Sequence, residues 1–265
     1  IPFLSHATME PQNAIAYWKE SSIDIITPSQ SLGGVTAKVA NYTGFKVENV
    51  HVQPMRAGGS FGRRLQADAV LEAVELSRKL KKPVKVTWTR EDDMAHDFYM
   101  STSRQRITAG VDKDGKIIAW HHQMASTTTD YRQPWSRPGG EWGDDVWEDL
   151  SPRRLIPNFK IDHALVKSRV PRGAWRGPLP TRQAFPSEGM FNKIAHETKQ
   201  DPIELRLKLY APGRAMQYKH WGNFNNTWNT ANMIGVLKAA ADKANWYAPR
   251  PEGVGRGIAS YFTFG

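Results

Sequence analysis

Apolar residues recur at helical spacing in five segments of the chain. In residues 31–42, Val35, Val39 and Ala40 fall on one face, and Gly44 provides a stop signal. The other four predicted helices span residues 68–80, 188–198, 203–210 and 232–245.

Three of these helices carry further local signals. Asp201 and Pro202 form a start signal for the helix over 203–210, with the side chain as cap and the proline in the first turn. The predicted apolar face of 68–80 comprises Val70, Ala73, Val74 and Leu80. The predicted apolar face of 232–245 comprises Met233, Val236, Leu237, Ala240 and Ala244.

Apolar and polar residues alternate in shorter segments, which predicts strands over residues 22–26, 47–53, 84–88, 104–111 and 116–124. The last two are separated by Asp-Lys-Asp-Gly, so we expect them to form a hairpin. Residues 130–155 are rich in Pro, Gly, Trp and charge without a period, which predicts a long surface loop. Because helices and strands alternate irregularly and a hairpin is included, the predicted fold class is α+β (mixed α/β).

Composition excludes several classes of site. The 265 residues include no cysteine, which rules out disulfides, thiolate metal ligands and thiol nucleophiles. No stretch approaches the roughly 18 apolar residues of a membrane-spanning helix. The formal charge is +10, with 36 Lys plus Arg against 26 Asp plus Glu. Nucleic acid would suit this charge, but the basic residues form no run longer than two, so a solvated basic surface or a face for an acidic partner is favoured.

The most specific local motif is Gly-Gly-Ser-Phe-Gly-Arg-Arg at residues 58–64, between a predicted strand and a predicted helix. Its glycines allow a tight turn whose successive amides can face an anion, and the following helix adds partial positive charge. The motif lacks the ending of a P-loop and the spacing of a dinucleotide fingerprint. From the residues alone, an anion cradle and a packing turn are equally good interpretations.

Other polar residues are weaker candidates. Arg176 stands in a Pro- and Gly-rich segment that would suit an oxyanion, although an exposed arginine explains it as well. His6 and Glu10 could perform acid–base chemistry, but structural roles are favoured. His121 and His122 are neighbours on a predicted strand, so their side chains point to opposite faces and cannot chelate one metal ion.

Five motifs in order resemble the molybdenum-binding large subunit of the xanthine oxidase and aldehyde oxidase family. They are HATMEP from residue 6, TPSQ ending at residue 30, GGSFGRR from residue 58, GAWRG from residue 173, and HETKQDPIELRLKL from residue 196. The most similar branch is the isoquinoline 1-oxidoreductase beta-subunit type of bacterial aldehyde dehydrogenase. The resemblance extends over residues 1–265 and implies a molybdopterin-binding domain.

The resemblance assigns roles to three of these motifs. Gln30 and Arg176 correspond to family residues at the metal and substrate, so both are expected to be catalytic and cofactor-binding. No residue is expected to ligate the metal itself. Replacing a loop glycine by valine is expected to obstruct the cofactor while leaving the fold intact. The Gly-rich loop implies further cofactor-binding residues: Gly58, Gly59, Ser60, Phe61, Gly62 and Arg63.

The resemblance also implies a cofactor and partners. The expected cofactor is molybdopterin cytosine dinucleotide with molybdenum, and the family reaction inserts water-derived oxygen into a C–H bond. The expected partners are the remaining part of the large subunit and a small subunit that carries the iron–sulfur clusters, with a cytochrome c as a further candidate and no nucleic acid. A periplasmic location is favoured over a cytoplasmic one.

Departures from the family pattern refine this expectation. Leu65 and Gln66 stand where purine oxidisers carry a glutamate, which favours an aldehyde or N-heteroaromatic substrate. The family's catalytic glutamate lies in a later motif, so we expect this chain to be a piece of a longer subunit and inactive alone. Residues 1–213 would form the first molybdopterin-binding domain, and 214–265 a connection and the incomplete start of a second. A non-catalytic structural or assembly module of the same fold, without metal, is the alternative.

Overall fold

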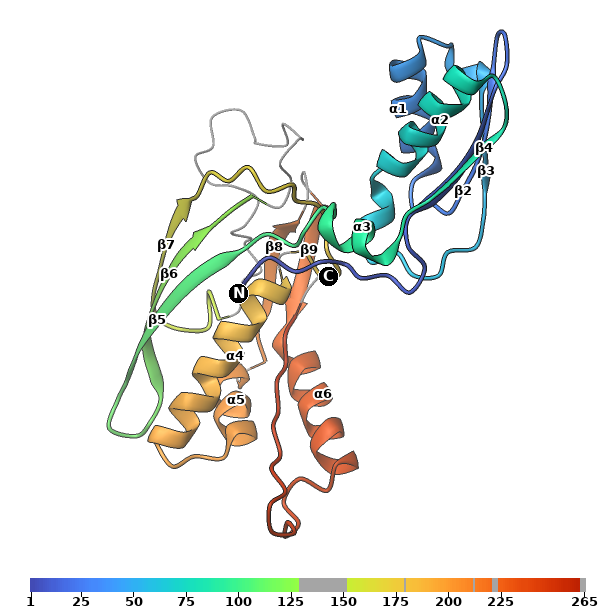
Figure 1. The fold of residues 1–265 in the computed structure, drawn as a ribbon. Helices are drawn as coiled ribbons and strands as arrows, with labels where there is room; N and C mark the ends of the chain where they lie inside the picture. The colour runs from blue at the N-terminus through green and yellow to red at the C-terminus, as the bar shows by residue number, and fades with distance from the viewer. Residues whose placement is uncertain (129–151, 179, 212, 221–223, 263–265) are drawn as a thin grey trace.

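The chain folds into two lobes, and residues 1–12 run from one to the other (Figure 1). The computed structural model describes residues 1–128, 152–178, 180–211, 213–220 and 224–262. One lobe holds a four-stranded sheet and the other a three-stranded sheet, each combined with helices, and a two-stranded hairpin follows. Both sheets combine parallel and antiparallel pairs, so the predicted α+β class is confirmed.

The sheet of the first lobe brings two predicted motifs to one edge. It comprises β1 (Asn13–Trp18), β2 (Ile23–Thr27), β3 (Val50–Pro54) and β4 (Val84–Thr87), in the order β3-β2-β1-β4. β1 is antiparallel to β2 and β4, whereas β2 and β3 are parallel. Because the carboxyl ends of parallel strands share one edge, the segments that follow β2 and β3 start close together there.

Two helices pack against this sheet. α1 (Leu32–Thr43) begins where the Ser31 side chain accepts the Gly34 amide, and it ends at Gly44, whose φ is 77°. α2 (Asp68–Leu80) has the predicted bounds. The shared core of β1, β2, β3, α1 and α2 comprises Ala14, Ala16, Ile23, Ile25, Val35, Val39, Val50, Ala67, Val70, Ala73 and Val74.

A short helix that the periodicity did not predict, α3 (Arg90–Ala95), leads out of the first lobe. It starts with a capping box, in which the Asp92 amide donates to Thr89 Oγ1 and the Thr89 amide donates to the Asp92 carboxylate. Six residues are too few to show an apolar period, so only the Thr89–Asp92 spacing and the acidic run 91–93 could have indicated this helix.

The second lobe is built on β5 (Ser103–Val111), β6 (Ile117–Ser126) and β7 (Asn158–Leu165). β5 and β6 form the predicted antiparallel hairpin, and β7 is parallel to β6. α4 (Pro180–Glu197) and α5 (Pro202–Tyr210) lie on one face of this sheet (Figure 1). Their shared core comprises Ile117, Trp120, Ile156, Phe191, Ile194, Ala195 and Leu205.

The C-terminal part adds β8 (Ala215–His220), β9 (Phe224–Asn229) and α6 (Thr230–Lys243). β8 and β9 pair antiparallel. Tyr210 at the end of α5 packs with Trp228, Met233 and Leu237, which joins this part to the second lobe. Within the described residues, no helix is both long and apolar enough to cross a membrane.

Several predicted boundaries and faces are wrong. Residues 47–49 form a 3₁₀ turn, so only the second half of the strand predicted over 47–53 is extended. Leu80 is 60% exposed because it lies in the last turn of α2, beyond the edge of the core. Val236 is 64% exposed, whereas Ala241 is buried, so the buried face of α6 is rotated from the predicted one. Most of the loop predicted over 130–155 lies outside the described residues.

α4 begins eight residues earlier than predicted because Pro186 does not end it. A proline inside a helix cannot donate to the carbonyl four residues earlier, here that of Arg182. In this protein the side chain of Gln105 donates to the Arg182 carbonyl at 2.9 Å instead. The contact comes from β5, so it could not be predicted from the local sequence.

His122 on β6 should make stability depend on pH. Its Nε2 lies 2.7 Å from Gln105 Oε1, and burial, assisted by the charge of His121, lowers the His122 pKa from 6.5 to about 4. The folded state therefore favours the neutral ring. The contribution of His122 to the free energy of unfolding is complete above pH 6.5 and is lost as the pH falls toward 4.

We expect the free energy of unfolding to fall by about 2 kcal/mol between pH 7 and pH 5 through this group. Denaturant unfolding at the two pH values measures it. His122→Gln should remove this decrease in the free energy of unfolding. His121→Gln changes the partly exposed neighbour and should leave most of the decrease in place. Equal slopes in both variants would contradict the assignment.

Candidate functional site

The Gly-rich loop between β3 and α2 exposes a row of backbone amides. Gly59, Phe61 and Gly62 have φ values of 100°, 52° and 106°. The amides of Gly59, Ser60 and Phe61 have no hydrogen-bond partner among the described residues. Successive free amides of this kind form a concave site for an anion.

Gln30 is fixed to this loop from the neighbouring strand end. Its Oε1 accepts from the Gly62 amide at 3.0 Å, and its own backbone amide donates to the Arg64 carbonyl at 3.1 Å. Within the described part of the chain, the Nε2 group of Gln30 has no partner. The side chain is thereby oriented with a hydrogen-bond donor left over.

The segment that carries Arg176 packs directly on the same loop. A Cβ atom on Gly62 would lie only 1.7 Å from the Ala174 carbonyl oxygen, so the two backbones are in close contact. The Arg176 guanidinium lies over the Phe61 ring, with 5.9 Å between Cζ and the ring centroid. The residues described here provide no carboxylate partner for that guanidinium. The structure thus brings together two motifs that are more than one hundred residues apart.

The resulting set consists of donors only. It combines three backbone amides of the Gly-rich loop, the Gln30 amide group and the Arg176 guanidinium. Such a set fits an oxyanionic or phosphate-bearing group, because each member donates and one carries a permanent positive charge.

The two arginines that end the motif have internal roles. Arg63 is 1% exposed, forms a double hydrogen bond to Asp68 at 2.9 and 2.6 Å, and pairs with Asp97 at 2.9 Å. Arg64 donates to the carbonyl of Gly59 and to Glu10. The Arg63 backbone amide also donates to the Ser60 carbonyl at 2.8 Å, so the donor groups of Arg63 are used within the protein, and both guanidinium groups hold the loop.

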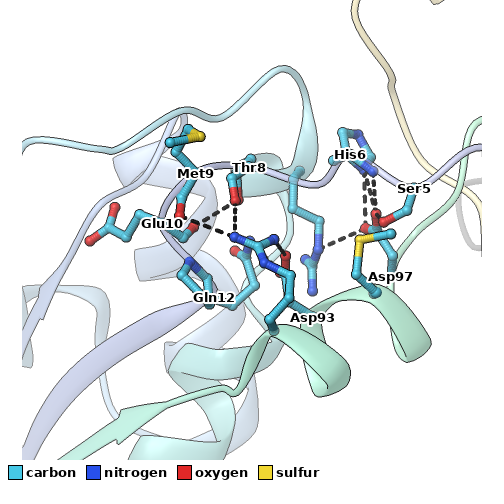
Figure 2. Close-up of polar contacts among 12 residues, drawn as sticks. Ser5, His6, Thr8, Met9, Glu10, Gln12, Asp93 and Asp97 are labelled. Carbon is cyan, nitrogen blue, oxygen red and sulfur yellow. Dashed lines mark hydrogen bonds and ion pairs between the residues drawn. The ribbon is translucent and has the colours of Figure 1, made fainter.

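Residues 5–12, here called the N-terminal strap, also hold the loop. Figure 2 shows their side chains next to Asp93 and Asp97. Glu10 Oε2 accepts from the Gly58 amide at 2.8 Å, and the Glu10 amide donates to the Gly58 carbonyl at 3.0 Å. Arg90 donates to the carbonyls of Thr8 and Met9. Burial raises the pKa of Glu10, but hydrogen bonds from Gly58 and Asn13 and the charge of Arg64 outweigh it, and the net shift is downward.

His6 in the strap lies between Asp97 and the Arg176 segment. Its Nδ1 is 3.0 Å from Asp97 Oδ1, and its Nε2 is 2.9 Å from the Ala174 carbonyl oxygen. Burial alone would raise the pKa of Asp97, but hydrogen bonds from His6 and Ser5 and the charge of His6 lower it. The structural role expected for His6 and Glu10 therefore fits their contacts.

The strand histidines do not form a metal site together. His121 contacts Asp162 of β7 at 2.6 Å, whereas His122 contacts Gln105 of β5, so the rings lie on opposite faces as predicted. Across the described residues, no group of three His, Asp or Glu side chains could hold a metal ion.

The supporting residues were not found from the sequence. Asp97 accepts from Ser5 and His6 although it lies more than ninety positions further along the chain. The acidic run 91–93 and the Thr89 cap were the only local signals for the helix that precedes it. Nothing in their spacing indicated a contact with the N-terminal strap.

Comparisons with known proteins identify the family of this chain. Residues 1–210 match the molybdopterin cofactor-binding domain family. The isoquinoline 1-oxidoreductase subunit beta of Brevundimonas diminuta is 28% identical over 213 residues, which cover 76% of this chain and 26% of that protein. The membrane-bound aldehyde dehydrogenase [pyrroloquinoline-quinone] of Gluconacetobacter polyoxogenes is 26% identical over 260 residues, or 91% of this chain and 32% of that protein.

A solved structure shows the same fold. Quinoline 2-oxidoreductase from Pseudomonas putida 86 superposes with a TM-score of 0.70 at 19% identity, over 92% of this chain and 31% of that one. The chain thus spans about a third or less of the length of these relatives. With the family match covering most of its length, the chain belongs to the molybdopterin cofactor-binding domain family, among the molybdenum-binding subunits of the xanthine oxidase type.

Proposed function

We propose that this chain forms part of the molybdenum-binding subunit of an enzyme that hydroxylates aldehydes or N-heteroaromatic compounds with oxygen from water. The observation that carries the proposal is the convergence of free donors from three separate segments on one loop. When bound, the cofactor supplies the redox chemistry, and the residues of the chain hold and orient it.

Each donor would have a distinct task. The amides of Gly59, Ser60 and Phe61 would bind oxyanionic atoms of the cofactor, since they are the open part of the concave loop. Gln30 would orient a neutral or partly charged oxygen through its Nε2 group, since Oε1 is taken by the Gly62 amide. Arg176 would stabilise negative charge at the substrate, which is the largest effect expected of a fixed cation in such a site.

The finer assignments follow from the family relationship. We propose molybdopterin cytosine dinucleotide as the form of the cofactor. Electrons would leave through iron–sulfur clusters in a small partner subunit, with a cytochrome c as the next acceptor. The boundary at residue 213 between a first domain and the start of a second belongs to the same proposal.

Two neighbouring residues favour substrates less polar than purines. Leu65 is 39% exposed and presents an apolar side chain beside the loop, and Gln66 is neutral. A purine would find no carboxylate at these positions, and a site without the hydrogen-bonding partner discriminates strongly against the substrate that needs it.

The general base of the reaction would come from outside this chain. Glu10 is the carboxylate nearest the loop amides by hydrogen bonding, but Gly58, Asn13 and Arg64 all donate to it. Its lowered pKa makes it a weaker base. We therefore propose that this chain alone does not turn over substrate.

The function is tested on the purified complete enzyme. We expect molybdenum bound to the subunit, and a kcat/KM for an aromatic aldehyde or an N-heteroaromatic compound about 100-fold or more above that for hypoxanthine in direct competition. A preference for hypoxanthine would overturn the substrate class. Folded complex that contains no molybdenum would instead favour the non-catalytic module.

A further inference from the structure

His6 connects the N-terminal strap to the segment that carries Arg176. Its side chain is 1% exposed and that of Asp97 is fully buried, so the ring is shielded from bulk solvent. Nδ1 faces the Asp97 carboxylate at 3.0 Å, and Nε2 faces the Ala174 carbonyl at 2.9 Å. Figure 2 shows the ring directly above Asp97, with Ser5 beside it.

If Asp97 is ionised, its carboxylate and the Ala174 carbonyl are both acceptors, and neither can donate a hydrogen bond to the ring. Asp97 is held in its ionised form because Arg63 stands against the carboxylate at 2.9 Å and the Ser5 hydroxyl donates to it at 2.6 Å. A neutral imidazole has one N–H group and would leave a lone pair against one of the two acceptors. Only the imidazolium, with two N–H groups, donates to both.

The Ala174 carbonyl is the point at which two loops meet. The same oxygen would clash with any side chain at Gly62, so its position sets the distance between the Gly-rich loop and the Arg176 segment. Trp175 adds a second link, because its Nε1 donates to the Ser5 carbonyl at 3.3 Å. Arg176 follows immediately and stacks on Phe61.

We propose that His6 is a positioning residue: as an imidazolium held by Asp97, it fixes the Ala174 carbonyl and thereby places Arg176 over the Gly-rich loop. The role in catalysis rests on the proposed function, whereas the charge state of the ring and the order of the segment do not. His6 touches neither substrate nor cofactor in this proposal and acts only through Arg176.

The charge state is tested without any substitution. Nitrogen-15 NMR of the ring in the complete subunit at neutral pH should show that both His6 nitrogens carry protons. His51 is the matched reference, since its Nδ1 also faces a carboxylate, Asp24 at 3.0 Å, but on an exposed surface without a second acceptor. A His6 ring with one unprotonated nitrogen would overturn the proposal.

Loop order is tested with His6→Gln, whose amide cannot donate to both acceptors as the imidazolium does. The Gly173 amide donates to the Tyr99 carbonyl at 3.2 Å, so its hydrogen exchange reports on the segment. We expect His6→Gln to accelerate this exchange by about tenfold or more, and His51→Gln to leave it unchanged. Unchanged exchange in His6→Gln would overturn the proposal.

The link to catalysis is tested by a double-mutant cycle in the complete enzyme. His6→Gln should lower kcat/KM by about tenfold when Arg176 is present and by less than about twofold in an Arg176→Met background. Equal losses in both backgrounds would show that His6 does not act through Arg176. If the exchange changes but neither substitution affects turnover, the positioning of the segment by His6 stands and the catalytic role proposed for Arg176 fails.

Discussion

Replacing Gly62 by alanine is expected to lower the free energy of unfolding by about 3 kcal/mol or more. Two causes add. Gly62 has a φ of 106°, which a residue with a side chain adopts only with strain. In addition, the new Cβ would lie 1.7 Å from the Ala174 oxygen and 2.6 Å from its carbonyl carbon. Because both atoms belong to the backbone, no side-chain rotation can relieve the overlap.

Gly59→Ala is the matched control for this prediction. Its φ of 100° imposes a similar strain, but its Cβ would meet the Phe61 ring at 2.9 Å, and that ring can rotate away. Denaturant unfolding of both variants therefore isolates the contact with Ala174 as a difference of about 2 kcal/mol. Equal losses would show that the two loops are not packed as described.

The same contact corrects an expectation from the sequence. Valine at a loop glycine was expected to obstruct the cofactor and leave the fold intact. At Gly62 this is wrong, because the side chain would meet the Ala174 backbone before it met any ligand. Gly59 is the better position for testing cofactor access, since the first atom it meets belongs to a movable ring.

Elements with complete local signals could be predicted from the sequence. Ser31 and Gly44 define α1, and the period of residues 68–80 defines α2, because caps and amphipathic faces are encoded within a few residues. The hairpin of β5 and β6 followed from its turn for the same reason. These parts also place Gln30 and the Gly-rich loop after neighbouring strands, which is half of the candidate site.

The other half depends on contacts between distant segments. His6 and Ala174 are 168 positions apart, and Glu10 and Gly58 are 48 apart. No periodicity relates positions this far apart. The sequence could therefore favour a structural role for His6 and Glu10, but it could not show that they contact Ala174 and Gly58. The buried face of α6 was misplaced for a similar reason: Tyr210 and Trp228, from other elements, decide which side is covered.

Arg176 is the residue whose loss should affect activity most. Its guanidinium is exposed, stacks on Phe61, and has no carboxylate partner among the residues that the structure describes. A cation that contacts a ring but has no carboxylate partner is not neutralised within the protein and can attract an anion. The Gly62–Ala174 contact and His6 hold the backbone that leads to it. Substitution of His6 therefore tests the position of the Arg176 cation, and substitution of Arg176 itself tests its charge.

We expect Arg176→Met to lower kcat/KM of the complete enzyme by about 100- to 1,000-fold, the range for loss of one preorganised donor. Arg176→Lys should fall between this variant and the unmodified enzyme, because lysine keeps the charge but loses the planar group that stacks on Phe61. Molybdenum per subunit, measured in parallel, separates lost chemistry from lost cofactor.

Arg169→Met, an exposed arginine seven positions earlier, is the control and should leave kcat/KM unchanged. If the Lys and Met variants retained the same activity as the unmodified enzyme, Arg176 would have no place in the site, and the donors would be reduced to the Gly-rich loop and Gln30.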